Sequence, residues 1–207
     1  MPAAEVEIRA VENRSDQQTF IRVPWQIYRE DRNWVPPLLV ERRQAFSSKY
    51  HFFRHAHWRA WIALRDGRPV GRISAQVDKL HLKWNDEHTG FFGLIEGEDD
   101  PAVFAALLHA AEDWLRGQGM QTVIGPFNLG INQELGLLVE GFGSPPYIMM
   151  GHAPRYYAER LEEQGYSKEQ ELLAYNLTKE AFALPDKVRH LLLRQRDKMR
   201  LRQVDRK

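Results

Sequence analysis

The residues best suited to chemistry lie in one glycine-rich stretch, residues 126–152, which reads PFNLGINQELGLLVEGFGSPPYIMMGH. A mainly apolar, glycine-rich stretch with scattered polar groups is typical of a binding loop on a rigid scaffold. Glu134 and His152 are residue types that act as general bases. The alternative is structural: asparagines hold turn backbone, and His152 caps the helix expected after Pro154. The polar side chains of the stretch are Asn128, Asn132, Gln133, Glu134, Glu140 and His152.

A second polar group is acidic. Glu96, Glu98, Asp99 and Asp100 fill four of the five positions from 96 to 100, and Pro101 follows. A capping aspartate followed by proline predicts the start of a helix. Four carboxylates repel a bound anion unless Lys or Arg comes in from elsewhere. This segment therefore favours helix capping over phosphate binding.

Several kinds of site are not supported by the sequence. The chain has 0 Cys, which excludes a disulfide framework, a thiolate zinc site and a cysteine nucleophile. His55 and His57 alternate on an extended segment with no carboxylate at ligand spacing, so no metal site is expected. The glycine-rich phosphate loop, the dinucleotide-binding fingerprint and the Gly-x-Ser-x-Gly elbow are all missing.

Composition predicts a folded globular protein. The 207 residues are 43% hydrophobic and 28% charged, and the 6 Trp and 10 Phe provide bulk for a core. No apolar stretch approaches the roughly 20 residues of a membrane span. The opening MPAAEVEIRA has neither the basic head nor the apolar run of a secretory signal. We therefore expect no membrane partner and a cytoplasmic, bacterial-type location.

Charge is unevenly distributed. Residues 187–207 hold nine Lys or Arg and two Asp, which leaves 20 basic and 26 acidic residues in positions 1–186. A basic tail can bind nucleic acid, whereas a solvated helix and linker explain the same pattern without a partner. The acidic body argues against a nucleic-acid groove in the main domain.

The elements expected to position these residues form an α/β pattern. Proline inside a helix removes a hydrogen bond, so Pro24 is expected to break or kink the first helix. Successive antiparallel strands followed by strand–helix–strand units predict a mixed central sheet with helices on both faces. Strands are expected at 5–11, 58–64, 69–77, 90–96, 122–127 and 172–177, with helices at 15–27, 38–47, 101–117 and 154–164, a polar loop at 83–90 and a basic helix from Leu184.

Three stretches resemble the GNAT-type acetyltransferases. DGRPVGRISAQV resembles the second and third strands of that superfamily, and PAVFAALLHAAEDWLRGQGM resembles its central helix. PRYYAERLEEQGYSKEQELLAYNL resembles its C-terminal helix and final strand, so the resemblance spans about residues 5–178. FIRVPWQIYREDRNWVPPLLVERR and GPFNLGINQELGLLVEGFGSPP resemble a poorly characterised bacterial group within it. The resemblance implies an acyl-CoA N-acyltransferase-like α/β fold.

The resemblance also implies a cofactor, acetyl-CoA, bound where the fourth and fifth strands part. The residues implied for its binding are Leu94, Ile95, Gly97 and Asn128. In the family, the pyrophosphate rests on a helix N-terminus within a Gln/Arg-x-x-Gly-x-Gly/Ala loop. The matching segment here, LIEGEDDPAV, keeps only Gly97 and departs from that pattern.

By the same resemblance, catalytic roles are expected for three residues. Glu134, with His152 as the other candidate, would deprotonate an amine, and Tyr156 or Tyr157 would protonate the leaving thiolate. Tyr157 also fits simple packing against Leu161 at helical spacing. Substrate binding is expected at Trp34, Asn132 and His152.

The function implied is transfer of an acetyl group from acetyl-CoA to an amine on a small molecule or peptide. The alternative is a non-catalytic GNAT-like domain with a structural or ligand-sensing role. We expect residues 1–180 to form the GNAT-like domain and residues 181–207 to form a basic helix and linker towards a second domain. The chain would then be the N-terminal half of a longer protein, with that second domain or a second copy of the chain as its partner.

Overall fold

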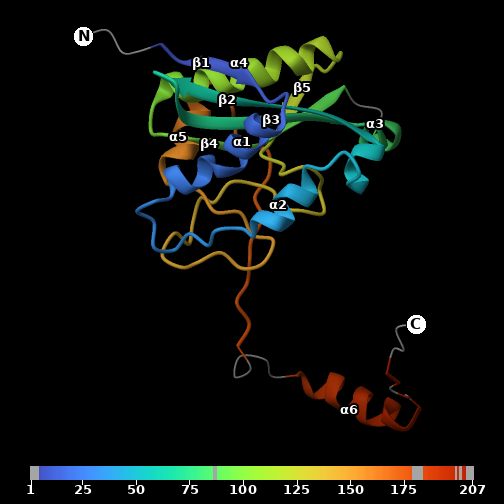
Figure 1. The fold of residues 1–207 in the computed structure, drawn as a ribbon. Helices are drawn as coiled ribbons and strands as arrows, with labels where there is room; N and C mark the ends of the chain where they lie inside the picture. Colours follow the sequence, from blue (N-terminus) through green and yellow to red (C-terminus); the bar gives the residue numbers. More distant parts are fainter. Residues whose placement is uncertain (1–4, 86–87, 179–183, 199, 201, 204–207) are drawn as a thin grey trace. The chain divides into compact units, whose positions relative to one another are not determined.

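The computed structural model describes residues 5–85, 88–178, 184–198, 200 and 202–203. Its centre is a five-stranded sheet in the order β1-β2-β3-β4-β5 (Figure 1). The first four strands pair antiparallel, and β4 and β5 pair parallel. The mixed sheet expected from the sequence is therefore confirmed. Its strands are β1 (Glu7–Ala10), β2 (Ala56–Arg65), β3 (Arg68–Asp78), β4 (Thr89–Gly97) and β5 (Thr122–Ile124).

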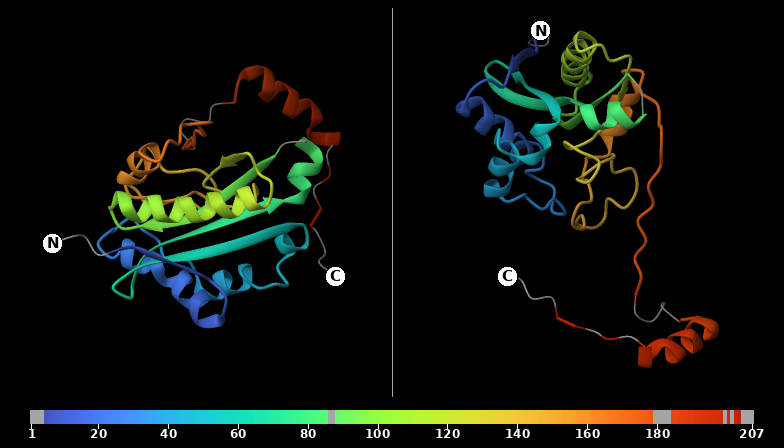
Figure 2. Two further views of the ribbon diagram at one scale, coloured as in Figure 1. Left: turned by 90° about the horizontal axis from the view of Figure 1, so that it is seen from above. Right: turned by 90° about the vertical axis from the view of Figure 1, so that its right-hand side faces the viewer.

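Helices cover both faces of the sheet (Figures 1 and 2). On one face, α4 (Pro101–Gly117) and α5 (Tyr156–Glu162) bury Phe104, Leu107 and Tyr157 in one hydrophobic cluster. On the other face, α1 (Arg14–Ile27), α2 (Leu39–Ala45) and the short 3-10 helix η1 (His51–Arg54) contribute to a second cluster that includes Phe20 and Phe52.

Helix α1 runs through Pro24 without a break, contrary to expectation. Asn13 caps its N-terminus by accepting hydrogen bonds from the Ser15 and Asp16 amides. Proline has no amide hydrogen, so the Phe20 carbonyl loses its intrahelical donor. The Arg72 guanidinium on β3 replaces that donor at 3.0 Å. A side chain from the neighbouring sheet thus completes the hydrogen bonding of the helix.

The β2–β3 hairpin turns at Asp66 and Gly67, both with positive φ, as the Asp-Gly signal predicts. Two other local predictions need adjustment. Residues 79–85 form helix α3 (Lys79–Asn85), whereas a polar loop was expected at 83–90. Strand β5 ends at Ile124 and not at Phe127, because Pro126 has no amide hydrogen to donate to a strand ladder.

The strand expected at 172–177 is wrong. Residues 171–178 have no strand pairing, and Leu172, Leu173, Tyr175 and Leu177 are each more than 60% exposed. An apolar pattern becomes a strand only where a sheet edge supplies hydrogen-bond partners, and that edge is not encoded locally. The strand–helix–strand unit expected after β5 is therefore not formed.

The chain divides into two compact units, residues 1–170 and 171–207. The second unit contains α6 (Asp186–Gln195), which confirms the basic helix, and a short 3-10 helix η2 (Arg196–Lys198). The linker expected after this helix lies mostly outside the described residues. Within the described part, no helix has both the length and the apolar character needed to span a bilayer.

Candidate active site

Strands β4 and β5 part beyond Phe91 and Ile124, the last residues that pair between them. The segment that follows β5 then covers the exposed edge of β4. The Phe127 amide donates to the Phe92 carbonyl at 2.7 Å, and the Asn128 side-chain oxygen accepts from the Leu94 amide at 2.8 Å. Leu94 has φ +50° at an irregular register between β3 and β4. The Leu94 amide, expected to grip a cofactor, is thus already satisfied by Asn128.

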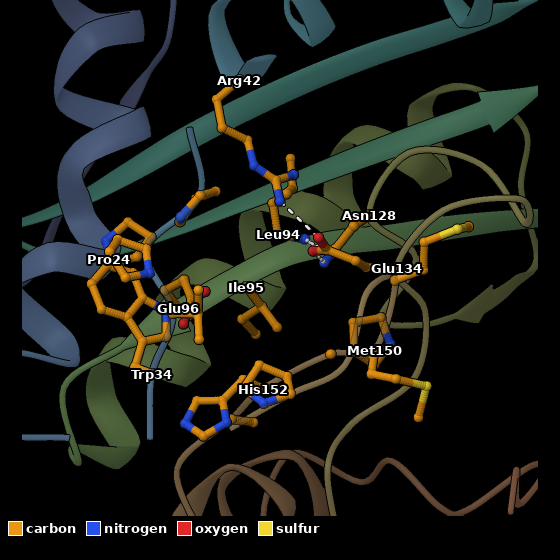
Figure 3. A pocket seen from close by; sticks show the side chains of 18 of the residues that line it. Pro24, Trp34, Arg42, Leu94, Ile95, Glu96, Asn128, Glu134, Met150 and His152 are labelled. Carbon is orange, nitrogen blue, oxygen red and sulfur yellow. Dashed lines mark hydrogen bonds and ion pairs between the residues drawn. The ribbon is translucent and has the colours of Figure 1, made fainter. Parts of the chain in front are cut away.

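Two cavities meet beside this point. The first has a volume of about 370 Å³ and is shown in Figure 3, and the second has about 440 Å³. Such volumes suit a small-molecule ligand. Both cavities are lined by Glu41, Arg42, Leu94, Asn128, Glu134 and Met149. A polar cluster at the junction of two cavities is a suitable place for two substrates to meet.

Glu134 lies in this junction, but its carboxylate is held by neighbours. Arg42 on α2 donates to Glu134 Oε1 at 2.7 Å, and Asn128 donates to Oε2 at 3.2 Å. The Asn128 amide also donates to the Glu134 carbonyl at 2.9 Å. A carboxylate committed to an arginine is better placed to orient the loop than to take a proton. The catalytic role predicted for Glu134 stays a prediction.

His152 forms a pair with Asp31, which lies just beyond α1. Their Nε2 and Oδ2 atoms are 2.7 Å apart. An ionised carboxylate only accepts, so Nε2 carries the proton and Nδ1 of the neutral ring keeps a lone pair. Burial would raise the pKa of Asp31, but hydrogen bonds from His152 and from the Asn33 amide hold it below its ordinary value.

The second nitrogen of His152 is the most suggestive atom in the site. Nδ1 is buried and has no hydrogen-bond partner among the described residues, while the ring lines the first cavity. A buried polar atom without a partner costs free energy, so such atoms are rare outside functional sites. Figure 3 shows His152 on the opposite side of the cavity from Arg42.

Glu96 forms a buried acidic centre in the same cavity wall. The hydroxyls of Tyr28 and Tyr157 each lie 2.7 Å from Glu96 Oε2, and Arg72 approaches Oε1 at 3.5 Å. Burial raises the pKa of Glu96, and the Arg72 charge and the two tyrosine hydrogen bonds offset this only in part. The Tyr28 hydroxyl also lies 3.1 Å from the His152 carbonyl, so this centre helps to position His152.

The two tyrosines expected to act as acids are already engaged. Tyr156 donates to the Gly97 carbonyl at 2.7 Å, and Tyr157 donates to Glu96 while accepting the Gly97 amide at 3.0 Å. Burial and nearby carboxylates raise the pKa of both phenols. Tyr157 is also 1% exposed within the core, as its alternative role predicted. Gly97 lines neither cavity, because the tyrosines cover it.

The acidic run at 96–100 meets four arginines from elsewhere in the fold. Besides the Glu96–Arg72 pair, Arg68 binds Glu98, Arg160 binds Asp99 at 2.8 Å, and Arg65 binds Asp100 at 2.6 Å. These arginines neutralise the acids, so their charge is not available to a phosphate. No local sequence pattern indicates these partners, because they come from β2, β3 and α5.

The N-terminus of α4 therefore does not fit a CoA pyrophosphate. Asp100 caps the helix by accepting from the Ala102 amide at 2.8 Å, and Pro101 offers no amide. Burial would raise the pKa of Asp100, but that hydrogen bond and Arg65 hold it below its ordinary value. A negative carboxylate thus occupies the position at which the dipole of the helix would attract an anion.

The remaining predicted residues lie around the two cavities. Trp34 lines the first cavity and stacks on Tyr28 with ring centroids 5.1 Å apart. Ile95 lines the same cavity, and Asn132 lines the second. Sequence reasoning missed Asp31, Arg42 and Arg72 as parts of this site. The one available signal was Glu96, a carboxylate that directly follows the apolar run GFFGLI.

No family model matches the chain. It is 43% identical over 199 residues to Protein YghO of Escherichia coli (strain K12), covering 96% of this chain and 51% of that protein. It is 48% identical over 174 residues to a bacterial ceramide synthase of Caulobacter vibrioides (strain NA1000 / CB15N), covering 83% of this chain and 45% of that protein. The chain thus spans about half the length of the curated relatives that it matches.

Solved structures identify the fold. An aminoglycoside acetyltransferase from an uncultured soil metagenomic sample, in complex with trehalose, superimposes with a TM-score of 0.50. The match covers 84% of this chain and 95% of that one at 11% sequence identity. Such low identity is informative about architecture and not about substrate. The described sheet, with β4 and β5 parting beyond Phe91 and Ile124, agrees with this likeness. The chain therefore has the GNAT-type acetyltransferase fold.

Proposed function

We propose that the chain catalyses acyl transfer from an activated acyl donor to a primary amine, with His152 as the general base. The observation that carries the proposal is the unpartnered Nδ1 of His152, buried in the cavity wall and oriented by Asp31. A histidine held by a carboxylate, with its other ring nitrogen unpartnered in the wall of a cavity, is suited to take a proton from an amine.

In the proposed reaction, the amine nitrogen attacks the carbonyl carbon of an acyl thioester. His152 Nδ1 accepts the proton that the nitrogen loses, the C–N bond forms, and the C–S bond breaks. The thiolate then takes the proton from the His152 imidazolium and leaves as a thiol. Asp31 stabilises the imidazolium in between. The Arg42–Glu134–Asn128 cluster fixes the loop at the junction of the cavities, where the two substrates would meet.

The name of one relative supports an amine acceptor. A ceramide synthase makes ceramide, which is the amide of a long-chain amino alcohol, and the chain is 48% identical to part of such an enzyme. We extend to this chain only the reaction class, which is acyl transfer to an amine. It includes no step through the CoA nucleotide, because Asp100 fills the helix N-terminus that would hold the pyrophosphate.

A second candidate is a ligand-sensing domain without catalysis. The observation that favours it is the same self-capped N-terminus of α4, where the resemblance expected an anion site. The two candidates differ in turnover: a sensing domain binds amines without forming amide, and its ligand affinity does not depend on the protonation of His152.

The test compares two histidine–aspartate pairs in the same chain. His55 and Asp78 are 2.8 Å apart, like His152 and Asp31, but His55 lines neither cavity. With a simple acyl thioester that carries no nucleotide as donor and an alkylamine as acceptor, His152→Gln should lower kcat by about 10²–10⁴-fold, and His55→Gln should leave it within about twofold. Equal activity of both variants, with normal folding by circular dichroism, contradicts the proposed base.

A further inference from the structure

Helix α6 has an exposed apolar face, formed by Val188, Leu191 and Leu192. These residues are spaced i, i+3 and i+4, which places them on one side of the helix. Val188 is 39% exposed, Leu191 58% and Leu192 45%. The structure describes every residue from 186 to 195, and none of them is buried. The apolar face of α6 therefore meets water and not the core of its own chain.

Basic side chains border this apolar face on both sides. At about 100° per residue, Lys187 and Arg194 lie on one side of it and Arg189 on the other. In the sequence, residues 187–207 hold nine Lys or Arg and two Asp, a net charge of +7. A helix with an apolar face and neighbouring Lys or Arg is typical of helices that lie in the plane of an anionic bilayer surface.

The length of α6 indicates that it needs a partner. It has ten residues, and the 3-10 helix η2 adds three more. A helix shorter than about 12–15 residues is marginally stable in water unless tertiary packing supports it. Since no residue of α6 is buried, such support has to come from outside the described chain.

Two other kinds of partner fit this helix less well. A nucleic acid attracts basic side chains, but its phosphate backbone does not cover an apolar face. A second copy of α6, packed face to face, would bring the basic side chains of the two helices together. A bilayer with anionic lipids satisfies both features, because its acyl region covers apolar side chains while its headgroups attract Lys and Arg.

We propose that α6 binds the surface of a bilayer that contains anionic lipids, with Val188, Leu191 and Leu192 inserted below the headgroups. The expectation of no membrane partner rested on the lack of a spanning run, which a helix lying on a surface does not need. This inference does not depend on the proposed acyl transfer, because the candidate site and α6 belong to different compact units.

Sedimentation of the purified 207-residue chain with lipid vesicles tests the proposal. The chain should bind vesicles of phosphatidylglycerol and phosphatidylcholine in equal parts, and pure phosphatidylcholine vesicles roughly tenfold or more less tightly, because an anionic surface attracts each nearby Lys or Arg. Added salt should weaken the first interaction, and helical circular dichroism should increase on binding. Equal binding to both kinds of vesicle, or binding to neither, overturns the proposal.

A matched pair of leucine variants locates the contact. Leu193 lies on the opposite side of α6 from the apolar face and is 56% exposed, close to the value for Leu191. Leu191→Ser should bind the anionic vesicles roughly tenfold more weakly than the unmodified chain, and Leu193→Ser within about twofold. Both variants make the same change in helix propensity. An equal loss in the two variants would mean that the apolar face does not contact the bilayer.

A nucleic acid as the partner is tested with the same two variants. Fluorescence anisotropy follows the binding of each chain to a labelled DNA duplex. If the chain binds DNA while Leu191→Ser and Leu193→Ser both bind vesicles as the unmodified chain does, the contact with lipid is only electrostatic and the proposal is wrong. If Leu191→Ser loses vesicle binding but not its affinity for DNA, the apolar face is specific for the bilayer.

Discussion

Arg72 connects the backbone of α1 to the acidic centre on β4. It donates to the Phe20 carbonyl, left without a donor by Pro24, and pairs with Glu96. Its removal leaves both groups buried without that partner. We expect Arg72→Met to lower the free energy of unfolding by about 3–5 kcal/mol, measured by urea denaturation.

Arg68 on the same strand provides the control. Its ion pair with Glu98 is largely exposed to solvent, so Arg68→Met should cost less than about 1 kcal/mol. A similar loss in the two variants would mean that Arg72 has no special structural role.

Glu96 should make stability depend on pH. Because burial holds the folded-state pKa of Glu96 above its ordinary value of 4.5, ionising it opposes folding. Its contribution is fully present below about pH 4.5 and is lost as the pH rises through the folded-state pKa. The stability of the unmodified chain relative to Glu96→Gln should therefore fall between acidic and neutral pH, as followed by urea unfolding at several pH values. A relative stability that rises with pH contradicts the raised pKa.

The sequence could identify residue types in the site but not their partners. His152 was predicted to bind substrate as one of the polar groups in a mainly apolar, glycine-rich stretch. Asp31, which orients it, lies 121 positions away. Likewise, four acids in a row predicted repulsion, and the arginines that neutralise them come from separate elements. Long-range pairing depends on the completed fold, which local patterns do not encode.

At the scale of elements, patterns were informative where local chemistry decides the outcome. Asp100 and Pro101 predicted the start of α4, and Asp66-Gly67 predicted the hairpin. Sequence patterns predicted the wrong structure where tertiary contacts decide the outcome. Pro24 is tolerated within α1 because Arg72 satisfies the Phe20 carbonyl, and the apolar residues 172–177 have no strand pairing.

The close approach of the loop after β5 to β4 requires glycine at position 93. A Cβ there would lie 1.7 Å from the Phe127 carbonyl oxygen. Because this contact is backbone, Gly93→Ala should displace residues 127–129 and cost roughly 3 kcal/mol or more by urea unfolding. Gly143→Ala, on the same irregular segment with nothing within 4 Å, should change stability by less than about 1 kcal/mol. Similar losses of unfolding free energy in the two variants would mean that residues 127–129 do not pack on β4.

At the scale of the whole molecule, both hydrophobic clusters are built from residues 6–166. The chain also divides into compact units after Gln170. A version ending at Gln170 should therefore keep the free energy of unfolding of the first unit within about 1 kcal/mol, as measured by urea denaturation. Loss of cooperative unfolding in the shortened chain would show that residues 171–207 are needed to complete the fold.

The division of the chain also bears on the domain prediction. A body ending at 180 and a basic segment after it were expected, and the compact unit ends ten residues earlier. A second domain beyond residue 207 stays a prediction. The candidate site lies within the first unit, so its chemistry can be tested in the 207-residue chain.

The central claim is that His152 holds its Nδ1 lone pair free for a substrate proton. Long-range ¹H–¹⁵N NMR of the ¹⁵N-histidine-labelled chain, at a pH where the ring is neutral, reads this directly. The structure predicts a proton on Nε2 and none on Nδ1. The Asp31→Asn variant should change the proportion of the two tautomers of His152. A proton on Nδ1 in the unmodified chain would contradict the account.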